Sequence, residues 1–238
     1  MIWNVHHRGE TASTNADARQ GRPGDVYTAD FQTAGRGRLD HKWLSPRGAN
    51  LMMSAVLSVE GLSPEHVSTV PLVVGLAVVR AVKAAVGEGV PVSLKWPNDV
   101  YVEGRKVAGI LCERCDDRVI AGIGVNVLQT EFPCEIAARA TSVVQAARGT
   151  FAGGVGTVRD LVLGELSGLY DLWREQGFAA VHSAIAAVDY LKGRHVAIRQ
   201  TDEDAEPVSG LSGGILSDGS LEVGGVRVYA GEAHVESL

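Results

Sequence analysis

Residues 95–111 read Lys-Trp-Pro-Asn-Asp-Val-Tyr-Val-Glu-Gly-Arg-Lys-Val-Ala-Gly-Ile-Leu, a series of short apolar runs separated by turn-forming residues. Pro97 and Asn98 favour one turn, and Gly104 with its neighbours favours another. We therefore expect short strands joined by tight turns. The expected strands are Val92–Trp96, Asp99–Val102, Lys106–Glu113 and Arg118–Val127.

Helical patterns surround these strands. Ser63 and Pro64 are typical of a helix start, and the apolar residues after them predict a buried helix to about Val86. Apolar residues recur at helical spacing again from Val158 to Trp173. We also expect a short helix from Ser13 to about Gln20, strands at Val26–Gln32 and Leu51–Val59, a long loop at 33–50 and irregular structure at 128–155. Residues 1–187 thus form one expected domain of class α+β.

The pattern of apolar residues changes after about residue 188, where helical spacing no longer occurs. Glycine pairs such as Gly213-Gly214 and Gly224-Gly225 punctuate short apolar runs. These runs predict strands at Gly193–Gln200, Val208–Leu216, Ser220–Val223, Val226–Tyr229 and His234–Glu236. Residues 188–238 therefore predict a small closed β-barrel, which we expect to pack on the first domain because it is too small to be very stable alone.

Composition and charge exclude several classes of protein. The chain has 22 Lys and Arg against 28 Asp and Glu, and this net charge of −6 disfavours general binding to a nucleic-acid backbone. No signal peptide is visible, and the apolar stretch at 70–79 is too short to cross a membrane. The three cysteines fit a reducing cytosol, and Cys112 and Cys115 should lie on opposite faces of a strand, which argues against a metal or redox pair. We expect a cytoplasmic protein with no membrane or DNA partner.

Two arginines stand in the loop after the first predicted strands, in the motif Gly35-Arg36-Gly37-Arg38. Guanidinium groups match phosphate and carboxylate geometry, and glycines let a loop approach an anion closely. The motif is equally compatible with a solvated surface loop. It is not a phosphate-binding P-loop, because no Gly-Lys-Ser/Thr follows.

Further candidates lie on the predicted strands. Asn98 and Asp99 follow Lys95 and Trp96, and Asp99 could hold a magnesium ion near phosphates, although Asn and Asp in a turn are more often structural. Lys106 opens an apolar strand, where it is either solvated or turned toward an anion. Gly109, Gly122 and Gly124 leave strand faces bare, either for a flat ligand or for a neighbouring backbone, and Asn126 offers both a donor and an acceptor.

The order and spacing of these motifs resemble the catalytic core of the biotin–protein ligases. The resemblance rests on Ser13-Thr14-Asn15, Gln32, Gly35-Arg36-Gly37-Arg38, Trp43, residues 95–99, residues 105–111 and Gly124-Val125-Asn126. It implies a class II synthetase-like core, a mixed sheet flanked by helices, followed by a small SH3-like barrel whose clearest match is 210–215. Ser13 comes so early that we expect no helix-turn-helix domain ahead of it and no repressor role.

The resemblance also implies an activity. Such ligases make biotinyl-5′-AMP from biotin and ATP with Mg²⁺, and then pass biotin to a lysine of a biotin carboxyl carrier domain in a biotin-dependent carboxylase. By resemblance, Ser13, Thr14, Asn15 and Gln32 bind the ureido end of biotin, and Gly109 and Gly122 line its pocket. Gly35, Arg36, Gly37 and Arg38 form the closing loop, Lys106 contacts the biotin carboxylate and the α-phosphate, and Trp43, Asn98, Asp99 and Asn126 serve the nucleotide and the metal. Catalysis would rest on Lys106, Arg36 and Arg38.

The chain departs from the family pattern at the tip of the loop. Asp40 replaces a glycine and His41 replaces an arginine, although Lys42 could compensate for the lost charge. A lipoate–protein ligase, which shares the fold and the adenylation chemistry, is the runner-up, and a catalytically silent carrier-binding protein is a third hypothesis. Edge strands of such a core could pair two subunits, so a homodimer stays open.

Overall fold

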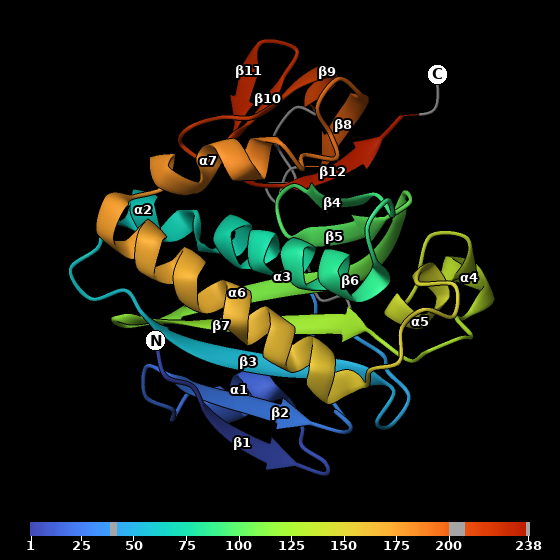
Figure 1. Ribbon diagram of the computed structural model, residues 1–238. Coiled ribbons are helices and arrows are strands. Elements are labelled where there is room, and N and C mark those ends of the chain that lie inside the picture. The colour runs from blue at the N-terminus through green and yellow to red at the C-terminus, as the bar shows by residue number, and fades with distance from the viewer. Residues whose placement is uncertain (39–41, 200–207, 237–238) are drawn as a thin grey trace.

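The computed structural model describes residues 1–38, 42–199 and 208–236 (Figure 1). Asp40 and His41, on which the expected departure from the family loop rests, lie outside the described residues. The larger sheet has seven strands in the order β1-β2-β3-β7-β6-β5-β4. They are β1 (Asn4–Arg8), β2 (Asp25–Ala29), β3 (Asn50–Ser58), β4 (Val92–Lys95), β5 (Asp99–Val102), β6 (Arg105–Cys115) and β7 (Arg118–Asn126). Only β1 and β2 pair in parallel among the described strands of this sheet, so the sheet is mixed and the α+β class is confirmed.

Helices cover one face of this sheet, where α3 (Val70–Val86) and α6 (Val155–Gln176) lie side by side (Figure 1). The other helices are α1 (Thr14–Ala18), α2 (Pro64–Ser68), α4 (Cys134–Ala137), α5 (Val143–Ala146) and α7 (Ala179–Ala186). The helix expected from Ser63 to Val86 is capped by Ser63 Oγ, which accepts from His66 N at 3.2 Å, but it breaks at Thr69. Pro71 accounts for the break, because it lacks the amide that would continue the hydrogen bonding.

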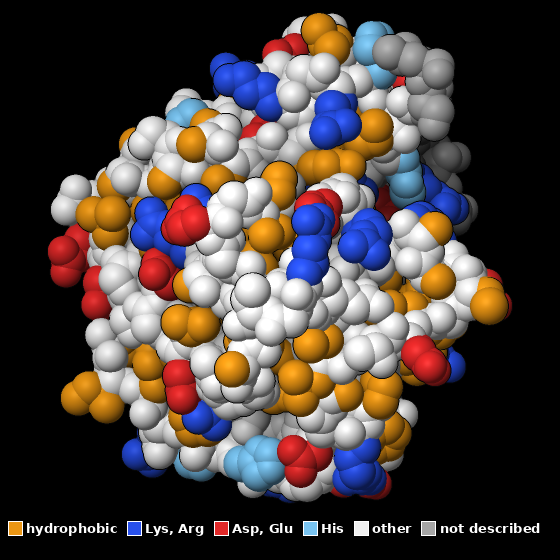
Figure 2. Space-filling model, turned by 45° about the vertical axis from the view of Figure 1, so that its right-hand side comes forward, with side chains coloured by type: hydrophobic (Ala, Val, Ile, Leu, Met, Phe, Trp, Pro, Cys, Tyr) orange, Lys and Arg blue, Asp and Glu red, His pale blue; other side chains and the backbone are white. Residues whose placement is uncertain are grey.

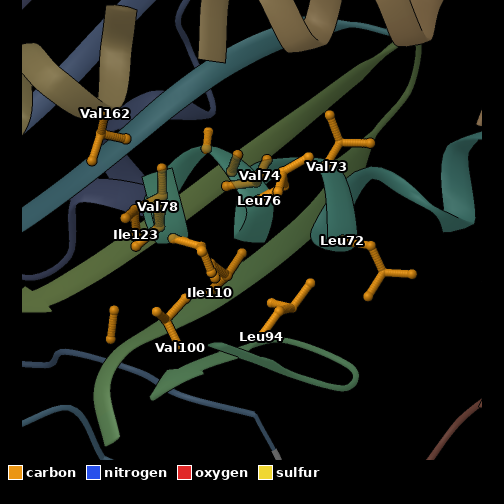
Figure 3. Packing of buried hydrophobic residues seen from close by; sticks show 14 of the residues in the cluster. Leu72, Val73, Val74, Leu76, Val78, Leu94, Val100, Ile110, Ile123 and Val162 are labelled. Atoms are coloured by element: carbon orange, nitrogen blue, oxygen red, sulfur yellow. The ribbon is translucent and has the colours of Figure 1, made fainter. Parts of the chain in front are cut away.

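The core lies between α3, α6 and the sheet. Leu76 and Val78 of α3 lie near Ile110 of β6 and Ile123 of β7 (Figure 3). Residues Pro64–Val86 are long and apolar enough to cross a membrane by length and composition, but 72% of their most apolar 18-residue window is buried inside the protein. Each large aliphatic side chain buried in this way contributes about 1.5–3 kcal/mol, so this segment is the central core helix.

A second sheet of five antiparallel strands follows, in the order β11-β10-β9-β8-β12. Its strands are β8 (His195–Arg199), β9 (Val208–Ile215), β10 (Leu221–Val223), β11 (Val226–Val228) and β12 (Glu232–Val235). This sheet is consistent with an SH3-like domain and lies beside the end of the first sheet that carries β4 (Figure 1). The Trp96 indole nitrogen donates to Gly219 O at 3.1 Å, and Leu94 N donates to Val188 O at 2.8 Å, so β4 and the residue after it join the two parts.

The surface agrees with the modest net charge. Figure 2 shows positive and negative side chains interspersed over one face of the molecule, with hydrophobic side chains between them. Such a mixed surface fits a net charge of −6 and a chain without a strongly single-signed face on this side.

Candidate active site

A cavity of about 140 Å³ lies on the sheet face opposite α3. Side chains of a strand alternate between its two faces, so Gly109 and Leu111 face the cavity while Ile110 between them packs in the core. The predicted site residues that line the cavity are Ser13, Thr14, Asn15, Gln32, Arg36, Gly37, Arg38, Trp43, Asn98, Asp99, Lys106, Gly109 and Gly122. The structure brings these residues together around one cavity, although they come from segments far apart in the chain.

A chain of polar side chains forms one wall of the cavity. Thr14 donates to Gln32 Oε1 through both its backbone amide at 2.7 Å and its hydroxyl at 3.1 Å. Ser54 Oγ lies 2.7 Å from Thr14 Oγ1 and 2.6 Å from Asn15 Oδ1. Within the described residues, Ser13 Oγ and Gln32 Nε2 have no hydrogen-bond partner, which leaves two polar groups for a ligand. Ser54 was not predicted, and the signal that could have found it is a single hydroxyl in the apolar strand at 51–59.

The side chains of Asn15 and Trp43 lie against the glycines of β7. A Cβ on Gly122 would lie 2.3 Å from Asn15 Oδ1, and a Cβ on Gly124 would lie 2.6 Å from the Trp43 ring. A side chain at either position would have to displace Asn15 or Trp43, because real contacts are not that short. Trp43 Nε1 is buried and has no hydrogen-bond partner among the described residues, so this wall of the cavity includes an unused donor.

Backbone contacts join the two ends of the arginine loop, and a side-chain hydrogen bond joins it to the turn before β5. The backbones of Arg36 and Lys42 form an isolated antiparallel β-bridge, and Trp43 N donates to Gly35 O at 3.0 Å. The Arg38 guanidinium donates to Asn98 Oδ1 at 3.2 Å, so the loop reaches the turn between β4 and β5. Gly35 lies at the root of the loop, outside the residues that line the cavity.

Positive and negative groups meet at the centre of the cavity. Lys106 Nζ lies 2.8 Å from Asp99 Oδ1, yet that buried oxygen receives no hydrogen bond of normal geometry from the described residues. Burial and the nearby charge of Lys106 lower the pKa of Lys95, while Asp99 and Glu232 act in the opposite direction. Glu232 comes from β12, so the second sheet contributes a charged residue that was not predicted.

Two predicted residues have other contacts. Asn126 does not line the cavity, and its amide donates to Thr141 O at 3.1 Å. Trp96 also lines the cavity, but its side chain is buried and its indole nitrogen donates to Gly219 O. The local sequence could not separate these roles, because both depend on a backbone carbonyl from a distant segment.

Cys112 and Cys115 lie on opposite faces of the sheet. Cys112 packs against the main core and Cys115 against a small cluster on the other face of the sheet, as the strand offset predicts. Burial raises the pKa of the Cys112 thiol to about 12. Over residues 1–38, 42–199 and 208–236, no group of three His, Cys, Asp or Glu side chains could hold a metal ion by itself.

Comparison with known proteins identifies the family of the chain. The model of the biotin/lipoate A/B protein ligase family matches residues 10–129, half of the chain and the range that contains every predicted site residue. The chain belongs to this family. It is 39% identical over 145 residues to a bifunctional ligase/repressor of Bacillus subtilis, covering 58% of this chain and 42% of that protein. It is 36% identical over 174 residues to a biotin–[acetyl-CoA-carboxylase] ligase of Mycobacterium tuberculosis, covering 69% and 63%.

The fold has a close structural relative. A biotin protein ligase from Aquifex aeolicus, solved in complex with biotin and ATP, superposes with a TM-score of 0.84 at 31% identity and 98% coverage of both chains. By contrast, the chain spans less than two thirds of the length of the two curated relatives above, at 42% and 63%.

Proposed function

We propose that this protein is an ATP-dependent biotin–protein ligase. It activates biotin as biotinyl-5′-AMP and transfers biotin to a lysine of a biotin carboxyl carrier domain in a biotin-dependent carboxylase. The observation that carries this proposal is the gathering of the arginine loop, Lys106 and the polar wall around one cavity. The likeness to a ligase solved with biotin and ATP, along nearly the whole chain, supports it.

The first step joins two anions. A biotin carboxylate oxygen forms a bond to the α-phosphorus of ATP, and the bond from that phosphorus to the bridging oxygen breaks, so that pyrophosphate leaves. Lys106 and Arg38 would offset the repulsion and stabilise the charge of the transition state. Lys106 is well placed for this because its partner Asp99 holds the ammonium at the cavity.

The second step needs no protein nucleophile. The amine of a carrier lysine forms a bond to the acyl carbon, AMP leaves with the bonding electrons, and a proton is lost from the nitrogen. Until then the acyl-adenylate must be shielded from water, and the loop that carries Arg36 and Arg38 would provide that cover.

The remaining roles follow from free polar groups. Ser13 Oγ and Gln32 Nε2 would bind the ureido end of biotin, beside Thr14 and Asn15. Trp43 and Asn98 would lie on the nucleotide side. We assign no ligand contact to Asn126, because its amide is used by Thr141.

A magnesium ion fits this site as part of a nucleotide complex. Asp99 offers a carboxylate that faces the cavity and lies 2.8 Å from Lys106 Nζ through Oδ1, and Mg²⁺ commonly takes one or two carboxylates with phosphate and water as its other ligands. Asp99 would hold the ion, which would supply positive charge to the phosphates.

We place the enzyme in the cytoplasm, because its three cysteines are free.

Pyrophosphate release tests the proposal. The protein is incubated with ATP, magnesium and either biotin or lipoate, and a carrier domain is then added to follow transfer. We expect release with biotin and a biotinylated carrier lysine. Release with lipoate only would favour the runner-up within the same family, and release with neither would favour a catalytically silent protein.

A further inference from the structure

Glu113 receives hydrogen bonds from three side chains at the edge of the cavity. Its Oε2 accepts from Asn15 Nδ2 at 2.6 Å, and its Oε1 accepts from Arg19 and from Arg36, each at 3.1 Å. Arg36 also reaches Oε2 at 3.2 Å. A carboxylate is the side chain suited to this task, because it only accepts and offers about four lone-pair sites.

The strand places this carboxylate at the rim. Gly109, Leu111 and Glu113 share one face of β6 because they are two residues apart, and the first two line the cavity. Glu113 therefore lies on the same face of β6 just beyond the cavity, where it contacts Arg36.

On the cavity side, Glu113 fixes the orientation of Asn15. The carboxylate has no proton to give, so the amide must face it with Nδ2, which also lies 3.3 Å from Leu111 O. Oδ1 then faces Ser54, 2.6 Å away, and the amide lies flat over Gly122. Asn15 is thus held from both ends, with its orientation set by Glu113.

On the loop side, Glu113 gives Arg36 a rigid partner. Ion pairs between exposed groups contribute little, because both side chains must be ordered. Here the Glu113 side chain is only 20% exposed, while Arg36 is 50% exposed, so one partner is already fixed. Burial raises the pKa of Glu113, but the hydrogen bond from Asn15 and the charges of Arg36 and Arg19 more than offset it, so the pKa lies below its ordinary value and the group is charged at neutral pH.

We propose that Glu113 is a positioning residue that couples the biotin wall of the cavity to the arginine loop. It holds Asn15 for biotin binding and holds Arg36 so that the loop stays closed over the acyl-adenylate. This inference rests on the proposed function, since the ligand it invokes is the biotin of that reaction.

Two variants separate the two contacts. Glu113→Ala removes both, and we expect the KM for biotin to rise about tenfold to a hundredfold, as for loss of a hydrogen bond to a charged group. The KM for ATP should change much less, and preformed biotinyl-5′-AMP should leave the protein faster. Glu113→Gln keeps an acceptor for Asn15 but loses the charge opposite Arg36. Its KM for biotin should therefore rise less, while the adenylate should still leave faster.

The matched control is Glu165→Ala, which removes a surface carboxylate paired with Arg80 at 3.4 Å. This variant should keep the wild-type KM for biotin and the wild-type retention of the adenylate. Wild-type values in both Glu113 variants would overturn the coupling, as would equal rises of the two KM values. If Glu113→Ala fails to fold, wild-type retention in Glu113→Gln alone overturns it. A wild-type protein that releases no pyrophosphate with biotin would instead refute the proposed function.

Discussion

At the residue scale, the pair of Lys106 and Asp99 places a positive charge where two anions, a carboxylate and a phosphate, would react. The two groups lie 2.8 Å apart, and the lysine side chain remains 37% exposed. Asp99 holds the ammonium in place without closing it off from the cavity. A bound carboxylate and phosphate could then share that charge.

Lys106→Ala should reduce the rate of adenylate formation by about a hundredfold or more, because it removes charge stabilisation in the transition state. Pyrophosphate release under saturating biotin and ATP measures this rate. Lys83→Ala is the control, since Lys83 lies on α3 and pairs with Glu88 at 3.9 Å. A variant at Lys106 that forms adenylate at the rate of the control would remove this lysine from the mechanism.

Gly122→Ala should weaken biotin binding. Its Cβ would lie 2.3 Å from Asn15 Oδ1, and the Asn15 amide cannot move freely because Ser54 and Glu113 hold it. A misplacement of about 1 Å can reduce the rate of a reaction about a hundredfold. We therefore expect the displaced Asn15 amide to raise the Kd for biotin about tenfold or more. Calorimetric titration with biotin would measure this change, and an unchanged Kd would show that the wall tolerates a methyl group.

Single residues were predictable where their chemistry is visible in the local sequence. Arg36 and Arg38 flank Gly37, Lys106 opens an apolar strand, and all three cations line the cavity. Ser54 and Glu113 were missed, because a serine in an apolar strand and a glutamate between two cysteines carry no signal until their partners are known.

At the element scale, α6 offers the clearest test of local packing. Gly164 and Gly168 lie inside this helix, and a Cβ at either position would meet nothing within 4 Å. Glycine in a helix interior costs about 0.5–1 kcal/mol relative to alanine. Open space beside both residues means that this cost is not offset by packing.

Gly164→Ala should therefore raise the free energy of unfolding by about 0.5–1 kcal/mol without changing the KM for biotin. The midpoint of urea unfolding is the appropriate measurement. The same substitution at Gly122 is the matched contrast, because there a Cβ collides with a held side chain. A loss of stability in Gly164→Ala would mean that α6 needs this glycine for a contact.

Elements with apolar periodicity or with clear cap and turn residues were predicted, whereas β1 and α7 were not. The residues of β1 are all exposed and show no apolar alternation, so no strand was expected at 4–8. The short helix α7 buries only Val181 and Ile185, which is too brief a pattern to detect. Pro71 was a visible signal for the break at Thr69, but the apolar run on both sides favoured one helix.

At the scale of the whole molecule, the two sheets depend on each other. Glu232 and Ala233 of β12 line the cavity that the first sheet builds. The short strands of the second sheet were predictable from the glycine pairs between them. The approach of this sheet to the cavity was not, because the sequence gives no relation between residue 232 and residues 95–106.

The Asp189 carboxylate links the segment after α7 to β9 of the second sheet. Its two oxygens accept from Leu191 N and Ile215 N, each at 2.9 Å, and burial raises its pKa although these backbone hydrogen bonds lower it. Asp189→Ala would leave both amides without their acceptor, at a cost of about 1–3 kcal/mol in the free energy of unfolding. Asp160→Ala, at an exposed position on α6, should have almost no effect in the same urea titration. Equal stabilities of the two variants would rule out Asp189 as a link.

The most direct test of the central claim is to identify the small molecule that the protein makes and retains. The protein is mixed with ATP, magnesium, biotin and lipoate together, passed through a desalting column, denatured and analysed by mass spectrometry. We expect biotinyl-5′-AMP in an amount close to that of the protein. Finding only lipoyl-5′-AMP, or no acyl-adenylate at all, would contradict the assignment of this protein as a biotin–protein ligase.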